Sequence, residues 1–281
     1  MRIIRTVTDM HRYADAARSS GQKIALVPTM GYLHDGHVSL MRRARECADV
    51  VVVSLFVNPL QFGPAEDFAA YPRDWDRDVR IMESAGVDVV FAPSAGEMYP
   101  DGFQTTVAVS RVTKNLCGIS RPGHFAGVAT VVAKLFLCVK PHLAVFGEKD
   151  FQQLTMIKRM VKDLAFDLDV IGAPIVREPD GLAMSSRNTY LSPAERSAAR
   201  SLSRALATAH ALFAAGQRTA AALIDAAHAE IGAEPLARID YIKICDAETL
   251  EDVQTITGDV VMALAVFFGK ARLIDNIVLR V

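Results

Sequence analysis

The chain has 281 residues, of which 51% are hydrophobic and 7% aromatic, so it can form one large or two moderate domains without disulfides or metals. Lys and Arg number 31 and Asp and Glu number 32, and the resulting formal net charge of -1 argues against a general nucleic-acid binder. Four scattered cysteines, an N-terminus without signal-peptide features and the lack of long uncharged apolar runs predict a cytoplasmic protein with no membrane segment.

Apolar and β-branched runs alternate with helical patterns in the first two thirds of the chain. The runs predict strands at 24–27, 50–57, 87–92 and 143–147, followed by short strands near 168–171 and at 174–176. Helical patterns occupy 37–48, 73–85, 128–139 and 150–164. Because such alternation is typical of a parallel sheet covered on both faces, we expect a doubly wound, Rossmann-like α/β domain over residues 1–176.

The pattern changes after the polar stretch 177–196. Ser192, Pro193 and Glu195 predict the start of a helix with a capping box, which should run to about Gly216 and precede a second helix at 219–231. Alternating segments at 239–246, 259–268 and 273–281 predict antiparallel strands. Residues 177–281 therefore read as a smaller α+β domain with an antiparallel sheet.

Two histidines follow the strand at 24–27, in the stretch "PTMGYLHDGH" (28–37). A loop that leads from a strand into a helix presents free main-chain N–H groups and the positive end of the helix dipole, which together favour an anion. Gly31 and Gly36 would let the backbone approach a ligand closely. His34 and His37, at i and i+3 on the first helical turn, would place both rings on one side as donors to phosphate oxygens.

The histidine pair by itself has other interpretations. It could bind a metal, although the spacing differs from the H-E-x-x-H of metalloproteases and no third histidine stands nearby. It could also be a chance surface pair, or one ring could be a buried core residue. The rest of the sequence decides between these possibilities.

Five blocks, in order along the chain, carry a resemblance to a known family. They are "PTMGYLHDGHVSLMRRA" (28–44), "VSLFVNPLQFGPAEDFAAYPR" (53–73), "RPGHFAGVATVVAKLF" (121–136), "FGEKDFQQL" (146–154) and "DGLAMSSRNTYLSP" (180–193). Together they resemble the pantoate–β-alanine ligase (pantothenate synthetase) family. The "HDGH" motif is similar to the His-Ile-Gly-His signature of the wider superfamily of nucleotidylyltransferases and class I aminoacyl-tRNA synthetases.

The resemblance implies an AMP-forming ligase. ATP would adenylate the carboxylate of (R)-pantoate and release pyrophosphate, and the amine of β-alanine would then attack the pantoyl adenylate and release AMP. In-line attack of a carboxylate on phosphorus needs positioning and charge neutralisation more than covalent help from the protein. The resemblance also implies ATP as co-substrate, Mg²⁺ with the ATP phosphates and a homodimer.

The resemblance assigns roles residue by residue. The catalytic set is His34, His37, Lys149 and Arg187, with His37 as the candidate general acid. The ATP-binding set is Met30, Gly31, Tyr32, Leu33, His34, Asp35, Gly36, His37, Gly147, Glu148, Lys149, Asp150, Val176, Met184, Ser185, Ser186 and Arg187. Asn58, Gln61 and Gln153 are assigned to pantoate and β-alanine, while no metal ligand is assigned and Tyr71, Arg121 and His124 receive no role.

Local chemistry supports these assignments but leaves alternatives open. Asn58 and Gln61 could simply be turn residues beside Pro59, Lys149 and Asp150 a solvated pair, and "MSSR" (184–187) a serine-rich turn. For the whole chain, the main alternative is a nucleotidylyltransferase acting on a phosphorylated acceptor. A non-catalytic nucleotide sensor and a tRNA-ligating enzyme are further alternatives, which the intact motif and the compact, near-neutral C-terminal part disfavour.

Overall fold

The computed structural model describes residues 1–64, 66 and 68–281 and divides them into two compact units. The first unit contains Met1–Thr113, Gly118–Glu148 and Gln153–Pro174, and the second contains Lys114–Cys117, Lys149–Gln152 and Ile175–Val281. Positions 65 and 67 of the sequence block 53–73 lie outside the described residues.

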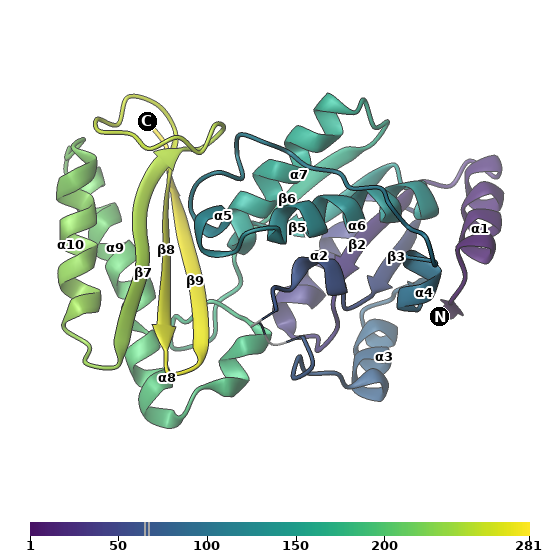
Figure 1. Cartoon of the computed structure of the whole chain (residues 1–281), viewed down its shortest axis with the longest axis horizontal. Helices are drawn as coiled ribbons and strands as arrows, with labels where there is room; N and C mark the ends of the chain where they lie inside the picture. Colours follow the sequence, from purple (N-terminus) through teal and green to yellow (C-terminus); the bar gives the residue numbers. More distant parts are fainter. Residues whose placement is uncertain (65, 67) are drawn as a thin grey trace. The chain divides into compact units, whose positions relative to one another are not determined.

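The first unit is built on a six-stranded parallel sheet (Figure 1). Its strands are β1 (Arg2–Ile4), β2 (Ile24–Thr29), β3 (Val50–Leu55), β4 (Val89–Phe91), β5 (Leu143–Gly147) and β6 (Asp169–Ala173), in the order β1-β4-β3-β2-β5-β6. Buried valines and other apolar residues fill the central strands, because both faces of a parallel sheet are covered.

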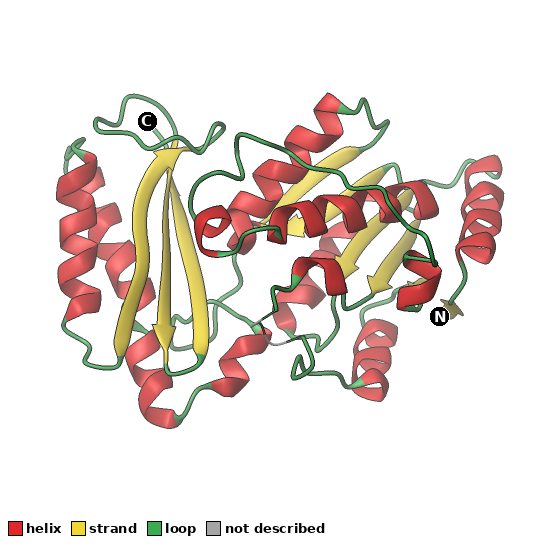
Figure 2. Ribbon diagram, in the orientation of Figure 1, coloured by secondary structure: helices red, strands yellow, loops and turns green. Residues whose placement is uncertain are grey.

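Helices lie on both faces of this sheet (Figure 2). They are α1 (Val7–Ser19), α2 (Asp35–Cys47), α3 (Trp75–Ser84), α4 (Ala95–Met98), α5 (Cys117–Ser120), α6 (His124–Val139) and α7 (Phe151–Asp163), with 3₁₀ turns η1 (Pro59–Gln61) and η2 (Glu148–Asp150). Leu40 and Met41 of α2 pack with Val27 and Val53 of the sheet, whereas α1 and α6 contact each other and β2. The predicted doubly wound α/β fold is confirmed.

Some predicted elements differ from those observed. The strand predicted at 174–176 is wrong: β6 ends at Ala173, directly before Pro174, whose nitrogen has no hydrogen to donate to a sheet. The N-terminal strand β1 and helix α1 were not predicted. The side chain of Thr6 accepts a hydrogen bond from the Asp9 main chain at the start of α1, a capping signal that the sequence does contain.

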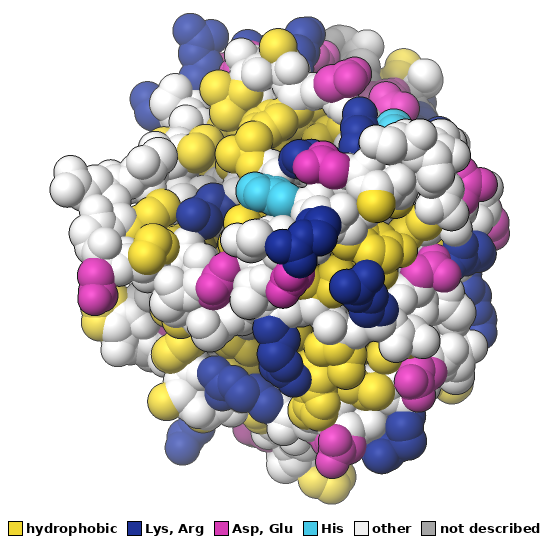
Figure 3. Space-filling view, turned by 90° about the vertical axis from the view of Figure 1, so that its right-hand side faces the viewer, with side chains coloured by type: hydrophobic (Ala, Val, Ile, Leu, Met, Phe, Trp, Pro, Cys, Tyr) yellow, Lys and Arg dark blue, Asp and Glu magenta, His cyan; other side chains and the backbone are white. Residues whose placement is uncertain are grey.

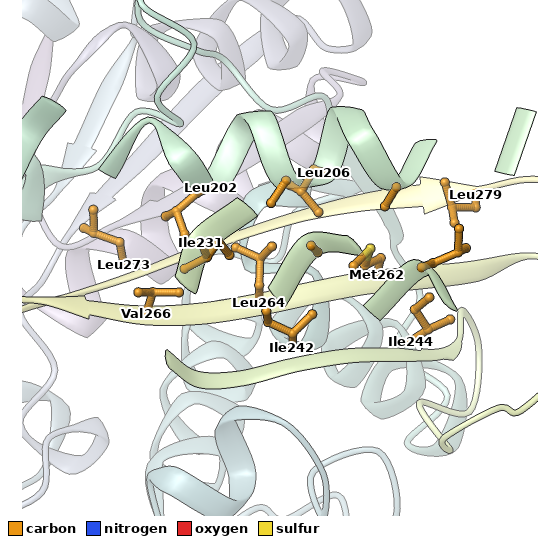
Figure 4. Packing of buried hydrophobic residues seen from close by; sticks show 14 of the residues in the cluster. Leu202, Leu206, Ile231, Ile242, Ile244, Met262, Leu264, Val266, Leu273 and Leu279 are labelled. Carbon is orange, nitrogen blue, oxygen red and sulfur yellow. The ribbon is translucent and has the colours of Figure 1, made fainter. Parts of the chain in front are cut away.

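The second unit combines an antiparallel sheet with helices. Its elements are η3 (Ser186–Tyr190), α8 (Pro193–Ala199), α9 (Ser201–Ala214), α10 (Ala220–Gly232), β7 (Ala237–Asp246), β8 (Val260–Phe268) and β9 (Ala271–Leu279), with strand order β7-β8-β9. Leu202 and Leu206 of α9 and Ile231 of α10 pack against Met262 and Leu264 of β8 (Figure 4). The predicted α+β architecture is confirmed, and so is the capping box formed by Ser192 and Glu195.

The long helix predicted from Pro193 to about Gly216 is interrupted. It forms two helices, α8 and α9, which meet at Arg200. No proline or glycine marks this position in the sequence, so pattern alone could not locate the break.

None of the helices in the described residues is both long and apolar enough to cross a membrane. The face drawn in Figure 3 carries Lys and Arg side chains close to Asp and Glu side chains, in keeping with the formal net charge of -1.

Candidate active site

The strand order of the first unit defines where a ligand should bind. From β2 the chain continues to β3 on one side, whereas β5 and β6 lie on the other side of β2. In open α/β sheets, ligands bind beyond the carboxyl ends of the strands at such a switch in direction. The three segments singled out in this unit, 30–37, 58–61 and 147–148, follow β2, β3 and β5, which are neighbours in the sheet.

The loop between β2 and α2 has an unusual backbone. Gly31 and Tyr32 both have positive φ, at 84° and 51°, a conformation that is rare for a residue such as tyrosine. Buried Asp78 of α3 holds this loop, because its carboxylate accepts hydrogen bonds from the main-chain N–H groups of Tyr32 (2.7 Å) and Leu33 (2.8 Å). Burial raises the pKa of the Asp78 carboxyl, although these two bonds favour its charged form.

The two histidines lie together at the start of α2, as the i, i+3 spacing predicted. His34 is the N-cap residue, and the ring centroids of His34 and His37 are 4.1 Å apart. The main-chain N–H of His34 donates to Nδ1 of His37 over 3.2 Å. Because Nδ1 of His37 is therefore an acceptor, the proton of its neutral ring is on Nε2. His37 can thus present an Nε2–H donor at the N-terminus of a helix.

Asn58 follows β3 and is only 1% exposed. Its Nδ2 donates to Gln61 Oε1 and to the Gly127 carbonyl, both at 3.1 Å. Its Oδ1 accepts from the Leu60 N–H (3.2 Å) and from the Tyr99 hydroxyl (2.7 Å). In the structure Asn58 thus caps η1 and orients Gln61, while its predicted contact with pantoate stays a prediction.

Gln61 lies at the end of η1 and is 9% exposed. Its Oε1 accepts from Asn58, and its Nε2 lies 3.1 Å from Met30 Sδ in the loop after β2. The residue predicted to hold pantoate thus contacts the segment predicted to bind ATP. An amide that can both donate and accept suits a hydroxy acid.

Lys149 belongs to the second unit, within the short η2 turn. Its side chain is 19% exposed, and its Nζ lies 4.0 Å from the Asp150 carboxylate. The side chain of Asn276, on β9, donates to the Lys149 carbonyl over 2.9 Å. Asn276 is a residue that pattern reasoning missed as a part of this site, since 127 positions separate it from Lys149.

A partly buried ion pair supports the segment around Val176. Arg177 donates from both of its terminal nitrogens to Asp275, over 2.7 and 3.0 Å, and the Asp275 side chain is 1% exposed. The Met184 N–H donates to the Val176 carbonyl over 3.0 Å. Val176 and the "MSSR" segment, both assigned to ATP, are therefore joined directly.

The "MSSR" segment leads into the η3 turn. Ser185 is its N-cap, and the Ser185 hydroxyl accepts from the Arg187 N–H over 3.3 Å. Asn188 donates to Glu178 (2.7 Å) and to the Ala183 carbonyl (3.1 Å), so the turn is tied to the preceding segment. The hydrogen bonds of Arg196 lower the pKa of the Glu178 carboxyl.

Each unit therefore gathers one part of the predicted set. The first unit contains Met30–His37, Asn58, Gln61, Gly147, Glu148 and Gln153, the last on α7. The second unit contains Lys149, Asp150, Val176, Met184, Ser185, Ser186 and Arg187. Among the residues that the structure describes, no group of three or more His, Cys, Asp or Glu side chains could hold a metal ion.

Comparisons with known proteins agree on one family. The model of the family described as pantoate-beta-alanine ligase matches residues 2–278. The pantothenate synthetase of Geobacter sulfurreducens is 60% identical over 279 residues, 99% of each chain, and that of Heliobacterium modesticaldum is 58% identical over 281 residues, 100% of each.

Solved structures give the same result. A crystal structure of pantothenate synthetase from Thermus thermophilus matches with a TM-score of 0.93 and 47% identity, over 99% of each chain. The ligase from Francisella tularensis, in complex with beta-gamma ATP and beta-alanine, matches with a TM-score of 0.80 and 35% identity, over 99% of this chain and 97% of that one. On this evidence, the chain belongs to the pantoate-beta-alanine ligase family.

Proposed function

We propose that this chain condenses (R)-pantoate with β-alanine at the expense of ATP, through a pantoyl-adenylate intermediate, and releases pyrophosphate and AMP. The observation that carries the proposal is the family match over residues 2–278, nearly the whole chain. The Francisella tularensis structure, which contains an ATP-type ligand and β-alanine, supports the same substrates here.

ATP binds at the loop after β2 in this proposal. The main-chain N–H groups at the start of α2 and the positive end of its dipole attract the phosphates. His37 donates a hydrogen bond from Nε2–H to a phosphate oxygen, because its Nδ1 already accepts from the His34 N–H. The general-acid role that the family resemblance implies would need a second proton, on Nδ1, in place of that hydrogen bond. Asp78 contributes indirectly, since it holds the loop in its left-handed conformation.

Gln61 and Gln153 bind pantoate in this proposal, and Gln61 also contacts β-alanine. Asn58, which the resemblance also assigns to these substrates, orients Gln61 through its amide, whose four hydrogen bonds are all made within the protein. The attack of the pantoate carboxylate on the α-phosphorus needs the two groups held in line, so a fixed Gln61 contributes to rate as well as to affinity.

The cations of the second unit stabilise the charge on the phosphates. Lys149 acts as a point charge, and Arg187 as a planar fork with Ser185 and Ser186 as hydroxyl donors. We also propose that residues 1–176 form the ATP and pantoate domain, and that residues 177–281 form a lid.

Further features rest on the family resemblance. We propose that Mg²⁺ enters as part of the ATP complex, that the enzyme is a homodimer and that it works in the cytoplasm. The free state of all four cysteines is in keeping with a reducing compartment. Sedimentation velocity tests the dimer directly.

Isotope exchange tests the proposed reaction. With pantoate present and β-alanine absent, labelled pyrophosphate should enter ATP, because adenylation precedes amide formation. Adding β-alanine should then release AMP and pantothenate. Exchange that required β-alanine would contradict the two-step reaction. Exchange without pantoate would contradict the proposal that pantoate is the substrate that is adenylated.

A further inference from the structure

Gln61 is held at its main chain as well as at its side chain. Its carbonyl oxygen lies 2.8 Å from Nδ1 of His124 and 3.3 Å from Nη2 of Arg121. His124 is the first residue of α6, and Arg121 lies just before it. Both residues come from the family block 121–136, and neither received a role from the sequence.

The partners of His124 define its protonation state. A carbonyl oxygen can only accept, so Nδ1 of His124 carries the proton that it donates to Gln61. Nε2 lies 3.0 Å from Nη1 of Arg121, which can only donate, so Nε2 accepts. The ring is therefore neutral, in a single tautomer, and each nitrogen serves a different partner.

Arg121 is fixed in turn by Glu66. Its Nε and Nη2 donate to the two carboxylate oxygens of Glu66, over 2.7 and 2.6 Å. Burial raises the pKa of the Glu66 carboxyl, but the hydrogen bonds and charge of Arg121 outweigh this effect and leave it lowered. Glu66, Arg121 and His124 thus form a chain of matched donors and acceptors that ends on Gln61.

The turn that carries Gln61 needs such support. The 3₁₀ hydrogen bonds of η1 are long: the Gln61 N–H donates to the Asn58 carbonyl over 3.4 Å, and the Phe62 N–H to the Pro59 carbonyl over 3.3 Å. Hydrogen bonds of this length are weak, and 3₁₀ geometry is poor in general. Contacts from outside the turn therefore fix the position of the Gln61 backbone.

We propose that His124, backed by Arg121 and Glu66, is a positioning residue for Gln61 in the adenylation of pantoate. Asn58 orients the side-chain amide of Gln61. His124 fixes the main chain of Gln61, from which that side chain extends. The inference rests on the proposed role of Gln61 in binding pantoate. It assigns to His124 no contact with substrate.

The test compares His124→Ala with His124→Asn in pantoate-dependent pyrophosphate exchange. The asparagine amide nitrogen can take the place of Nδ1 and keep the donor to Gln61, whereas alanine removes it. We expect His124→Ala to lower kcat/KM for pantoate about tenfold, the loss of one good hydrogen bond, with KM for ATP changed less than about twofold. His124→Asn should recover most of the loss.

His142→Ala is the matched control. Nδ1 of His142 accepts from the Ile24 N–H over 2.9 Å, so this variant also removes a contact between a histidine and the backbone, but at the opposite end of β2. It should lower the melting temperature and leave kcat/KM for pantoate unchanged. If the role of His124 were purely structural, His124→Ala and His124→Asn would lose kcat/KM for pantoate to the same extent.

A double-mutant cycle shows whether His124 acts through Gln61. In a Gln61→Ala background, adding His124→Ala should change the exchange rate less than about twofold, because the group being positioned is already absent. Full additivity, or a His124→Ala variant with wild-type kcat/KM for pantoate, would overturn the inference. If the wild-type protein itself showed no pantoate-dependent exchange, the proposed function would fail instead.

Discussion

At the scale of single residues, His37 and Lys149 are expected to act on charge that develops during the reaction. In the proposed mechanism each donates to phosphate oxygens, and such a contact strengthens as charge builds up in the transition state. His37→Ala or Lys149→Ala should therefore lower kcat by about 100–1000-fold and raise KM for ATP much less. Steady-state kinetics with ATP as the varied substrate gives both parameters.

His210→Ala is a suitable control for the histidine variant, because His210 is exposed on α9 and lies outside every predicted site. It should behave as wild type. If His37→Ala or Lys149→Ala retained a kcat within about threefold of wild type, that residue would have no part in the chemistry.

Variants of Gln61 test the proposed pantoate site rather than the ATP site. Gln61→Ala should impair pantoate-dependent exchange while ATP binding, measured by calorimetry, stays nearly unchanged. Gln61→Glu should be worse, because a new carboxylate would repel the pantoate carboxylate at short range in a mostly buried position. If Gln61→Glu bound pantoate as tightly as wild type, the pantoate site would lie elsewhere.

Candidate residues for the site could be chosen from the sequence, but few of the contacts that hold them could. The histidine pair follows from local spacing, because positions i and i+3 at a helix start are neighbours whatever surrounds them. Asp78 and Tyr99 support Leu33 and Asn58 from 45 and 41 positions away along the chain. Such contacts depend on how separate elements pack, and no local pattern encodes them.

At the scale of elements, the packing of α6 against η1 depends on Gly127. A Cβ atom at this position would lie 2.2 Å from the Leu60 carbonyl oxygen and 2.7 Å from the Gln61 nitrogen. Both are backbone atoms, so Gly127→Ala must displace the turn. We expect it to destabilise the protein by about 1–3 kcal/mol and to lower kcat/KM for pantoate.

Gly96→Ala is the matched control, since a Cβ there meets nothing within 4 Å. Thermal unfolding and pyrophosphate exchange should both remain at wild-type values in this variant. Wild-type exchange in Gly127→Ala would show that the position of η1 does not matter for pantoate.

Element prediction succeeded where burial alone sets the pattern. The buried apolar runs of β2, β3 and β5 identify central parallel strands, because both faces of such strands are covered. It failed where the signal is short or tertiary. Strand β1 has three residues and pairs with β4 at the edge of the sheet, and the break at Arg200 has no local marker.

At the scale of the whole molecule, carboxylates stabilised by partners make folding depend on pH. The pKa of Glu178 is lowered by hydrogen bonds from Arg196 and Asn188, which outweigh the effect of burial. Burial also raises the pKa of Glu66, but Arg121 lowers it by more. A lowered carboxyl pKa means that the unfolded chain binds the proton more tightly than the folded protein. The stability that such groups contribute is therefore present above their unfolded pKa, about 4.3 for Glu, and is lost as the pH falls through the folded value.

The pKa of Asp78 is shifted in the opposite direction from those of Glu66 and Glu178. Because burial raises its pKa, protonation favours the folded state at this position and offsets part of the acid destabilisation. The loss of the hydrogen bonds that charged Asp78 accepts from Tyr32 and Leu33 should nevertheless loosen the loop between β2 and α2 in acid. Activity should therefore fall at a higher pH than the free energy of unfolding does.

Glu178→Gln separates one of these groups from the rest. At pH 7 the variant should be less stable than wild type, because glutamine lacks the charge that Arg196 pairs with. As the pH falls from about 5 toward 3, wild-type Glu178 is itself neutralised, so the difference in unfolding free energy should shrink. Urea unfolding across this pH range measures the difference in unfolding free energy. Glu248→Gln is the control, because Glu248 is exposed. A difference that stayed constant with pH would mean that the contacts of Glu178 do not depend on its charge.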